Sequence, residues 1–325
     1  MKLSVYFFGI RITVANFAIM KKAYHICLSS GDEVCCRDEE DYVYYFNALA
    51  LAVEKTESSL LADAVMSNHV HECLRTACPK EVATMQRYTY TRYFNSKYLR
   101  RGSLFLRPPF IIELEGLYHK LAALSYTLRN PVHHGVTATP FEYRHSSARA
   151  LFRDALGRDD CQDFLPEYLC HRYLPDHRSC PSGYKMGKNG LILRENVLDV
   201  SDVEHMFMTP RSFLYYMNRL SGEEWQREQE KDLLAGAPIT LDVIESGIGY
   251  QSMSQMLAFE HGRADYRAMD DLALCEKIDN EILPAMGRES VYMLLPQEKV
   301  RLAEMLCRDL GLPRAQVVRC LAMNY

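Results

Sequence analysis

The chain has 325 residues, of which 48% are hydrophobic and 25% are charged, so its composition excludes a wholly disordered protein and allows two domains. No apolar run is long enough to span a bilayer, which excludes an integral membrane protein. The eleven cysteines form neither a Cys-x-x-Cys pair nor an evenly spaced framework, which is typical of reduced thiols in the cytoplasm. The net charge of −4 conceals an asymmetry, because residues 1–147 carry 17 Lys and Arg against 14 Asp and Glu, and the remainder carries 21 against 28.

Residues 1–20 are expected to be an N-terminal extension, either an added β-strand or residues upstream of a chain that begins near Met20. From Lys21 the apolar periods and turn residues predict the order strand, helix, strand, strand, helix, strand, helix. The strands are expected at 21–30, 58–66, 69–76 and about 104–114, and the helices from the acidic cluster at 38–41, at about 80–99 and at 117–129, before Asn130-Pro131. This order predicts an α+β domain over 21–150, with a ferredoxin-like antiparallel sheet and helices on one face.

Beyond residue 150 the strand signals nearly vanish, and prolines and glycines indicate an irregular connector. Helical stretches are expected at about 202–220, 223–235, 239–259 and 266–283, and a final pair at about 296–309 and 314–322. We therefore expect a helical accessory region over 151–290 and a separate C-terminal helix pair over 291–325.

The most distinctive local pattern is Asn68-His69-Val70-His71 at the start of a predicted strand. Because side chains alternate across a strand, both histidines point to the same face. Two imidazoles placed this way could bind one divalent cation, and the alternative is a pair of surface histidines.

Tyr126 lies on the last helix of the predicted domain, almost opposite its apolar stripe, and Asn130 follows one turn later on the same side. A hydroxyl and an amide oxygen on that side could reach a shared site, the tyrosine as a nucleophile and the asparagine as a ligand. The alternative is an amphipathic tyrosine that only packs.

A basic tract covers residues 79–107, where tyrosines are interleaved with cations and Glu81 is the single acid. Its candidate DNA-binding residues are Arg87, Arg92, Lys97, Arg100, Arg101 and Arg107. Cations track a phosphate backbone and aromatic faces accept unstacked bases, so this composition is typical of a surface for single-stranded nucleic acid. A solvated basic helix with buried tyrosines has the same composition.

Thiols and imidazoles also cluster in the connector, at Cys161, Cys170, His171, His177 and Cys180. Zinc accepts such ligands, but the spacings match no common zinc motif, and ordinary buried thiols are the alternative.

Three motifs in this order resemble the REP-associated tyrosine transposases and the wider group of HUH single-strand transposases. They are AVMSNHVHECL over 64–74, RYFNSKYLRRGSLFLRPPF over 92–110, and LSYTLRNPVHHGVTATPFEYRHSS over 124–147. The resemblance covers about 21–150. It implies that the chain cleaves and rejoins single-stranded, hairpin-bearing DNA through a 5′-phosphotyrosine intermediate, with Tyr126 as the nucleophile.

The resemblance also implies a bound Mg²⁺ or Mn²⁺, with His69 and His71 as ligands and Asn130 as a third ligand or positioning group. Imidazole ligands suit Mn²⁺ better, so stronger activity with manganese is expected. Two positions depart from the family pattern: Ser67 stands where proline is common, and Glu72 stands where an apolar residue is usual. Glu72 is expected to face solvent, pair with an arginine or perturb the site.

The C-terminal helix pair resembles a helix-turn-helix appended to some family members, with Arg314, Gln316 and Arg319 on the candidate recognition helix; a packing hairpin is the alternative. Single-stranded DNA is expected to follow the basic tract into the His69–Tyr126 site, with the acidic helices on the opposite side or shielding the site. The protein is expected to be a monomer or a homodimer. The rival functions are a non-catalytic DNA-binding regulator and a metal-dependent hydrolase that activates water.

Overall fold

The computed structural model describes residues 4–7, 10–13, 20–157, 163–219, 223–231, 236–248, 257–260, 263–266 and 269–323. None of the helices in these ranges is long and apolar enough to cross a membrane.

Four antiparallel strands form the central sheet in the order β4-β5-β3-β6. Their bounds are β3 Lys22–Ser29, β4 Ser59–Val65, β5 His69–Thr76 and β6 Phe110–Glu113. The strand β5 is an inner strand, and its His71 lies opposite Cys27 of β3 and Ala64 of β4. The histidine motif is therefore held by strands on both sides.

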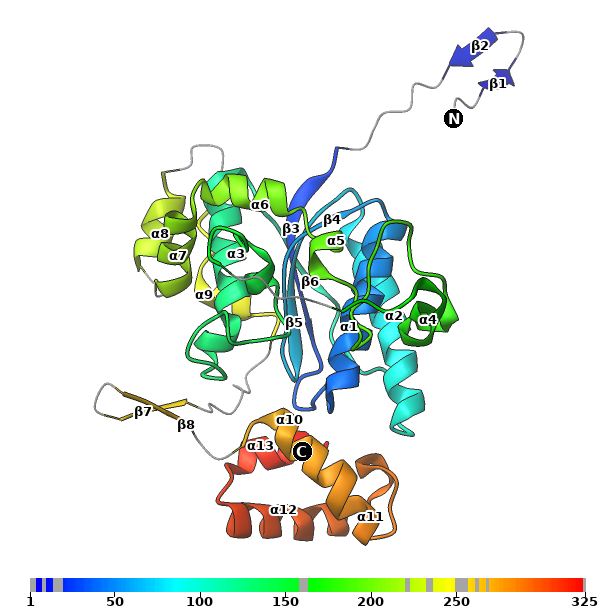
Figure 1. Cartoon of the computed structure of the whole chain (residues 1–325), viewed down its shortest axis with the longest axis vertical. Coiled ribbons are helices and arrows are strands. Elements are labelled where there is room, and N and C mark those ends of the chain that lie inside the picture. Colours follow the sequence, from blue (N-terminus) through cyan, green and yellow to red (C-terminus); the bar gives the residue numbers. More distant parts are fainter. Residues whose placement is uncertain are drawn as a thin grey trace.

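Helices cover both faces of this sheet (Figure 1). The helices α1 (Glu39–Lys55) and α2 (Pro79–Lys97) pack on the face that carries Ile26, and α3 (Gly116–His133) packs on the face that carries Ala23. The predicted α+β class with a four-stranded antiparallel sheet is confirmed. The prediction that the helices lie on one face is correct for α1 and α2. It is wrong for α3, which packs on the opposite face.

Two element boundaries differ from the prediction for identifiable reasons. The helix α3 continues through Pro131 to His133, because a proline in the last turn forfeits little of the helical hydrogen bonding and its carbonyl accepts from Val136 N at 2.8 Å. The strand β6 has four residues and begins at Phe110, after Pro108 and Pro109, which have no N–H to donate to a neighbouring strand. The helix α1 begins as expected, with Asp38 accepting a hydrogen bond from Asp41 N.

The accessory region wraps around the sheet and its helices. Its helices are α4 Glu167–Cys170, α5 Arg194–Val197, α6 Val200–Phe207, α7 Pro210–Asn218, α8 Glu223–Gln229 and α9 Leu241–Glu245. Isolated bridges from Leu198 to Leu60 and from Ser146 to Ala64 cover the outer edge of β4. The helices α6, α7 and α9 share the apolar core of α3, so the nucleophile candidate lies beneath the accessory region.

The C-terminal helices form a unit with its own apolar core. It contains α10 Asp271–Lys277, a π-helical turn at Ile278–Ile282, α11 Leu283–Ala285, α12 Pro296–Leu310 and α13 Arg314–Cys320. The predicted pair corresponds to α12 and α13. However, their core includes Leu274 and Ile278, so residues 269–323 are called the C-terminal helical unit here, and it begins before the expected boundary at 291.

Two short hairpins complete the described ranges. In the expected N-terminal extension, β1 (Ser4–Phe7) pairs with β2 (Ile10–Thr13). Later, β7 (Leu257–Glu260) pairs with β8 (Arg263–Tyr266). Among the described residues of the helices predicted over 239–259 and 266–283, the first span forms α9 and the strand β7, and the second forms α10 and the π-helical turn that follows it.

Candidate functional site

The two motif histidines lie on the α3 face of β5, and both are fully buried. Alternation along the strand sends Glu72 to the opposite face, where Tyr45 Oη and Gln86 Nε2 donate hydrogen bonds to it at 3.0 and 2.6 Å. Burial raises the pKa of Glu72 to about 7, and these two donors partly offset the rise. Glu72 thus neither faces solvent nor pairs with an arginine, and it points away from the histidines.

His69 is oriented from both sides of its ring. Its Nδ1 lies 2.8 Å from Asn68 Oδ1, and its Nε2 lies 3.0 Å from Asn130 Oδ1. The amide of Asn68 also donates to the Gly31 carbonyl at 3.4 Å, which fixes the oxygen of Asn68 toward the imidazole. In the tautomer with the proton on Nδ1, Nε2 presents its lone pair to Asn130.

His71 is oriented by a residue that sequence reasoning missed. Its Nδ1 lies 3.0 Å from Nε2 of His25 on β3, and the two rings stack with centroids 5.1 Å apart. Its Nε2 is buried without a hydrogen-bond partner among the described residues. The one available signal was a histidine within the otherwise apolar strand sequence KAYHICLS.

Tyr126 meets the histidines across the sheet face. Its ring lies edge-on to His71, with centroids 5.1 Å apart, and its hydroxyl donates to Glu245 Oε1 at 3.3 Å. Burial, with Glu245 as the next cause, raises the pKa of Tyr126 well above its ordinary value. The structure thus brings together Tyr126, His69, His71 and Asn130 from one chain, and it holds the phenol in its neutral form.

The donors fit a divalent cation. With Nδ1 protonated, His69 Nε2 and Asn130 Oδ1 are two acceptors facing each other in a buried space, which a rotated Asn130 amide or a bound cation would satisfy. Their 3.0 Å separation equals that of adjacent ligands around an octahedral ion with bonds of about 2.1 Å. In both motif histidines Nδ1 has a partner and Nε2 faces inward, as in metal-bound imidazoles.

The imidazoles are also in the protonation state that metal binding requires. Burial lowers the pKa of His69 to about 4 and holds that of His71 well below its usual range, so both are neutral at pH 7. Throughout the described ranges, no three His, Cys, Asp or Glu side chains converge to hold a metal. The candidate ligands that the sequence resemblance implies are two imidazoles and one amide, and the amide is not among those four side-chain types.

Residues 240–248, called the closing segment, cover this site. Glu245 pairs with His133 at 2.7 Å as well as with Tyr126, and Ser29 Oγ donates to the Ile248 carbonyl at 2.8 Å. Gly247 approaches the sheet so closely that a Cβ there would lie 2.9 Å from the Cβ of Phe110. Tyr126 is consequently 1% exposed, and Glu245 presents a carboxylate to its hydroxyl.

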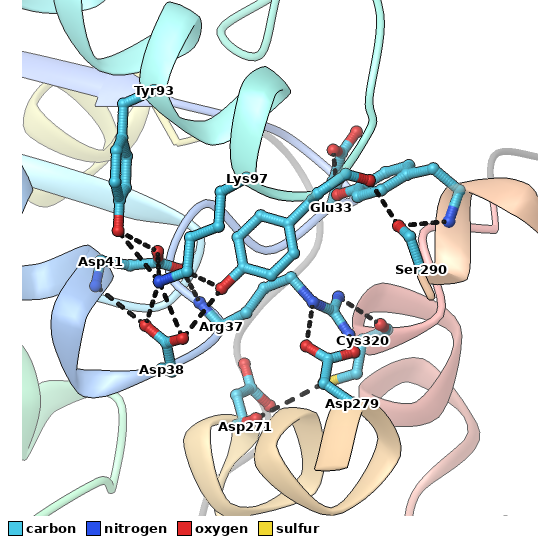
Figure 2. Close-up of polar contacts among 12 residues, drawn as sticks. Glu33, Arg37, Asp38, Asp41, Tyr93, Lys97, Asp271, Asp279, Ser290 and Cys320 are labelled. Carbon is cyan, nitrogen blue, oxygen red and sulfur yellow. Dashed lines mark hydrogen bonds and ion pairs between the residues drawn. The ribbon is translucent and has the colours of Figure 1, made fainter. Parts of the chain in front are cut away.

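The basic tract lies mostly on the other face of the sheet, because its helix is α2. Lys97 is bound by Asp38 and Asp41 (Figure 2) and also by Glu40, and Arg100 pairs with the buried Glu33 at 2.6 Å. The predicted path of DNA along the whole tract is therefore corrected, since these two cations have carboxylate partners within the chain.

The remaining cations of the tract are more accessible. Arg87 donates to the Phe105 carbonyl, and the exposed Arg92 pairs with Asp176 at 3.3 Å. Arg101 and Arg107 are exposed and lie between α2 and β6. Arg107 is three residues before Phe110, which lies at the sheet edge against Gly247 of the closing segment.

The candidate recognition helix presents one of its three predicted residues to solvent. Arg314 is exposed, whereas Gln316 is buried and donates to the Met269 carbonyl at 2.9 Å. Arg319 is fully buried against Asp271, at 2.9 and 3.0 Å. The assignment of Gln316 and Arg319 to a DNA-reading surface is thus corrected: both hold the C-terminal helical unit together.

The thiols and imidazoles of the connector do not converge into a described metal site. Cys170 is buried in the α1–α2 core, and Cys180 is half-buried near it. His171 and His177 are exposed, with ring centroids 6.3 Å apart. Cys161 lies outside the described residues.

A comparison with solved structures found a likeness. It is to a solved structure, a REP-associated tyrosine transposase bound to a REP hairpin. That protein is 12% identical, and the match covers 47% of this chain and 94% of that chain, with a TM-score of 0.35. No family model and no curated protein matches the chain.

Proposed function

We propose that the chain is a transposase-like nuclease that cleaves and rejoins single-stranded DNA through Tyr126. The observation that supports this most directly is the convergence of Tyr126, Asn130 and the two motif histidines, from α3 and β5, in one buried cluster. Nothing in the apolar packing of α3 requires a tyrosine, an asparagine and two histidines to meet there. The three-motif sequence resemblance points to the same four residues.

In the proposed reaction, the Tyr126 oxygen forms a bond to phosphorus while the bond from phosphorus to the 3′ oxygen breaks. The phenol proton is released, the departing 3′ oxygen takes up a proton, and the 5′ phosphate stays on the tyrosine. Reversal with another 3′-hydroxyl rejoins a strand without ATP, because the phosphodiester energy is kept in the adduct.

His69, His71 and Asn130 would hold a Mg²⁺ or Mn²⁺ ion, which would polarise the phosphoryl group and stabilise the developing charge. Asn68 and His25 orient the two imidazoles for this role. Positive charge near Tyr126 also favours the phenolate, opposing the effect of burial on its pKa.

The same geometry requires that the site open before it can act. A phosphodiester cannot reach Tyr126 while the closing segment lies on it, and the Glu245 carboxylate repels an approaching phosphate. DNA binding and displacement of residues 240–248 are therefore coupled in this proposal.

The test is to incubate the protein with hairpin-bearing single-stranded DNA and Mn²⁺, then to resolve products under denaturing conditions. A covalent adduct is expected with the wild type and with Tyr168→Phe, a matched control whose tyrosine is 74% exposed, and not with Tyr126→Phe. Cleavage that survives in Tyr126→Phe would assign the chemistry to activated water. Binding without cleavage in the wild type would point to a regulator.

A further inference from the structure

The C-terminal helical unit docks on the nuclease-like domain through buried charges. Arg37, fully buried on the domain side, donates to both carboxylate oxygens of Asp279 at 2.8 Å and to the Cys320 carbonyl at 2.8 Å (Figure 2). The two parallel hydrogen bonds to one carboxylate are geometrically specific, so this pair fixes how the unit is oriented on the domain.

A second contact of this unit reaches the turn between β4 and β5. Ser67 Oγ donates to Asp271 Oδ2 at 2.6 Å, and Arg319 holds the same carboxylate from the other side. Ser67, Asp271 and Arg319 are 3%, 5% and 0% exposed, so water does not compete for these bonds.

This turn leads directly to the candidate metal ligand. The Ser67 carbonyl accepts from the Cys35 and Cys36 amides at 2.6 and 3.1 Å, which anchors the turn on its other side. The next residue, Asn68, accepts the His69 Nδ1–H at 2.8 Å. Only Asn68 therefore lies between Ser67, which contacts the carboxylate, and His69.

We propose that Asp271 is a positioning residue that acts through Ser67 to fix the imidazole of His69. The C-terminal helical unit thereby helps to set the geometry of the site, and this role rests on the proposed function of His69. Ser67 is one of the positions at which the sequence departs from the family pattern. The proline that is common there has no hydroxyl to donate, so this link belongs to the serine of this chain.

The test removes only the hydroxyl, with Ser67→Ala, and restores it with Ser67→Thr. The matched control is Ser290→Ala, because Ser290 also joins the unit to the domain, through the Tyr98 carbonyl, but touches nothing in the histidine turn. Full-length protein with ¹⁵N-labelled histidine gives the imidazole nitrogen signals of His69 by long-range NMR, and Mn²⁺ affinity is measured by calorimetry.

Ser67→Ala is expected to shift the His69 nitrogen signals and to weaken Mn²⁺ binding by roughly tenfold. This is the lower end of the loss in metal affinity that follows when a group orienting a metal ligand is removed. Ser67→Thr is expected to restore both, and Ser290→Ala to change neither. His69 signals that are the same in Ser67→Ala and wild type would overturn the positioning role.

The result of this test can be distinguished from the result of the adduct test of the proposed reaction. If the wild type forms no DNA adduct, the reaction is refuted, and the His69 signals still decide the role of Asp271. If the adduct forms and Ser67→Ala leaves the signals unchanged, the reaction stands and the positioning role fails.

Discussion

Replacing Gly247 by alanine should open the site. A Cβ at residue 247 would lie 2.9 Å from Phe110 Cβ and 3.0 Å from Cys27 Cβ, closer than such atoms approach in proteins. Both neighbouring atoms belong to backbone-anchored positions of β6 and β3, so they cannot swing aside as the end of a long side chain does. The closing segment must therefore move away from the sheet.

Overpacking of this kind costs about 1–3 kcal/mol. The cost falls on the closed arrangement alone, because the open segment has no contact with Phe110 or Cys27. The open fraction should consequently rise roughly 5- to 150-fold. If opening limits the reaction, the rate of adduct formation should rise by the same factor until another step becomes limiting.

The assay is the initial rate of Tyr126–DNA adduct formation under single-turnover conditions. Gly236→Ala is the control within the same stretch of chain, because a Cβ there meets Glu115 Oε2 at an ordinary 3.5 Å. Circular dichroism should show that both variants are folded. Equal rates for Gly247→Ala and Gly236→Ala would refute the idea that the closing segment restrains the site.

Three further outcomes are expected. Glu245→Gln weakens the partly exposed contact with His133, which is an ion pair when the imidazole is protonated and is then worth about 0.5–1 kcal/mol, so it should speed adduct formation by roughly 2- to 5-fold; an unchanged rate would contradict this. Arg101→Ala with Arg107→Ala should lower the salt dependence of single-strand binding by a slope of about 0.7 per lost contact, whereas an unchanged slope would place the DNA elsewhere. Glu72 has a pKa of about 7 when folded against 4.5 ordinarily, and the folded state keeps a proton that the unfolded chain has released. Stability should therefore fall by roughly 3 kcal/mol as pH rises between these values, and Glu72→Gln should abolish that dependence in urea unfolding at pH 5 and pH 8.

The sequence was informative where the relevant spacing is local. The two-residue period of a strand placed His69 and His71 on one face, and the helical period placed Tyr126 and Asn130 one turn apart. These relations depend on backbone geometry alone, so they could be predicted before the fold was known.

Relations between distant segments could not be read in this way. Lys97 and Arg100 look like phosphate ligands in a basic tract, yet their partners are carboxylates 56 to 67 residues away in sequence. His25 and Glu245 reach the site from β3 and from the accessory region, and no periodicity connects them to the motif. The composition shows only that a cationic side chain is present. Whether a carboxylate of the same chain neutralises it depends on the fold.

The closing segment belongs to the same chain as the nucleophile that it covers. Its local concentration around Tyr126 is set by the tether, typically in the millimolar range for a short flexible connection, and does not change on dilution. DNA therefore competes against a ligand that never diffuses away, and its apparent dissociation constant exceeds the intrinsic one by the reciprocal of the open fraction. Under the proposed function, a strand held only at Arg101 and Arg107 would gain too little to displace the segment, whereas one that also contacts the histidines would displace it. Under the proposed function, the tether would thus act as an affinity threshold that separates incidental single strands from substrate.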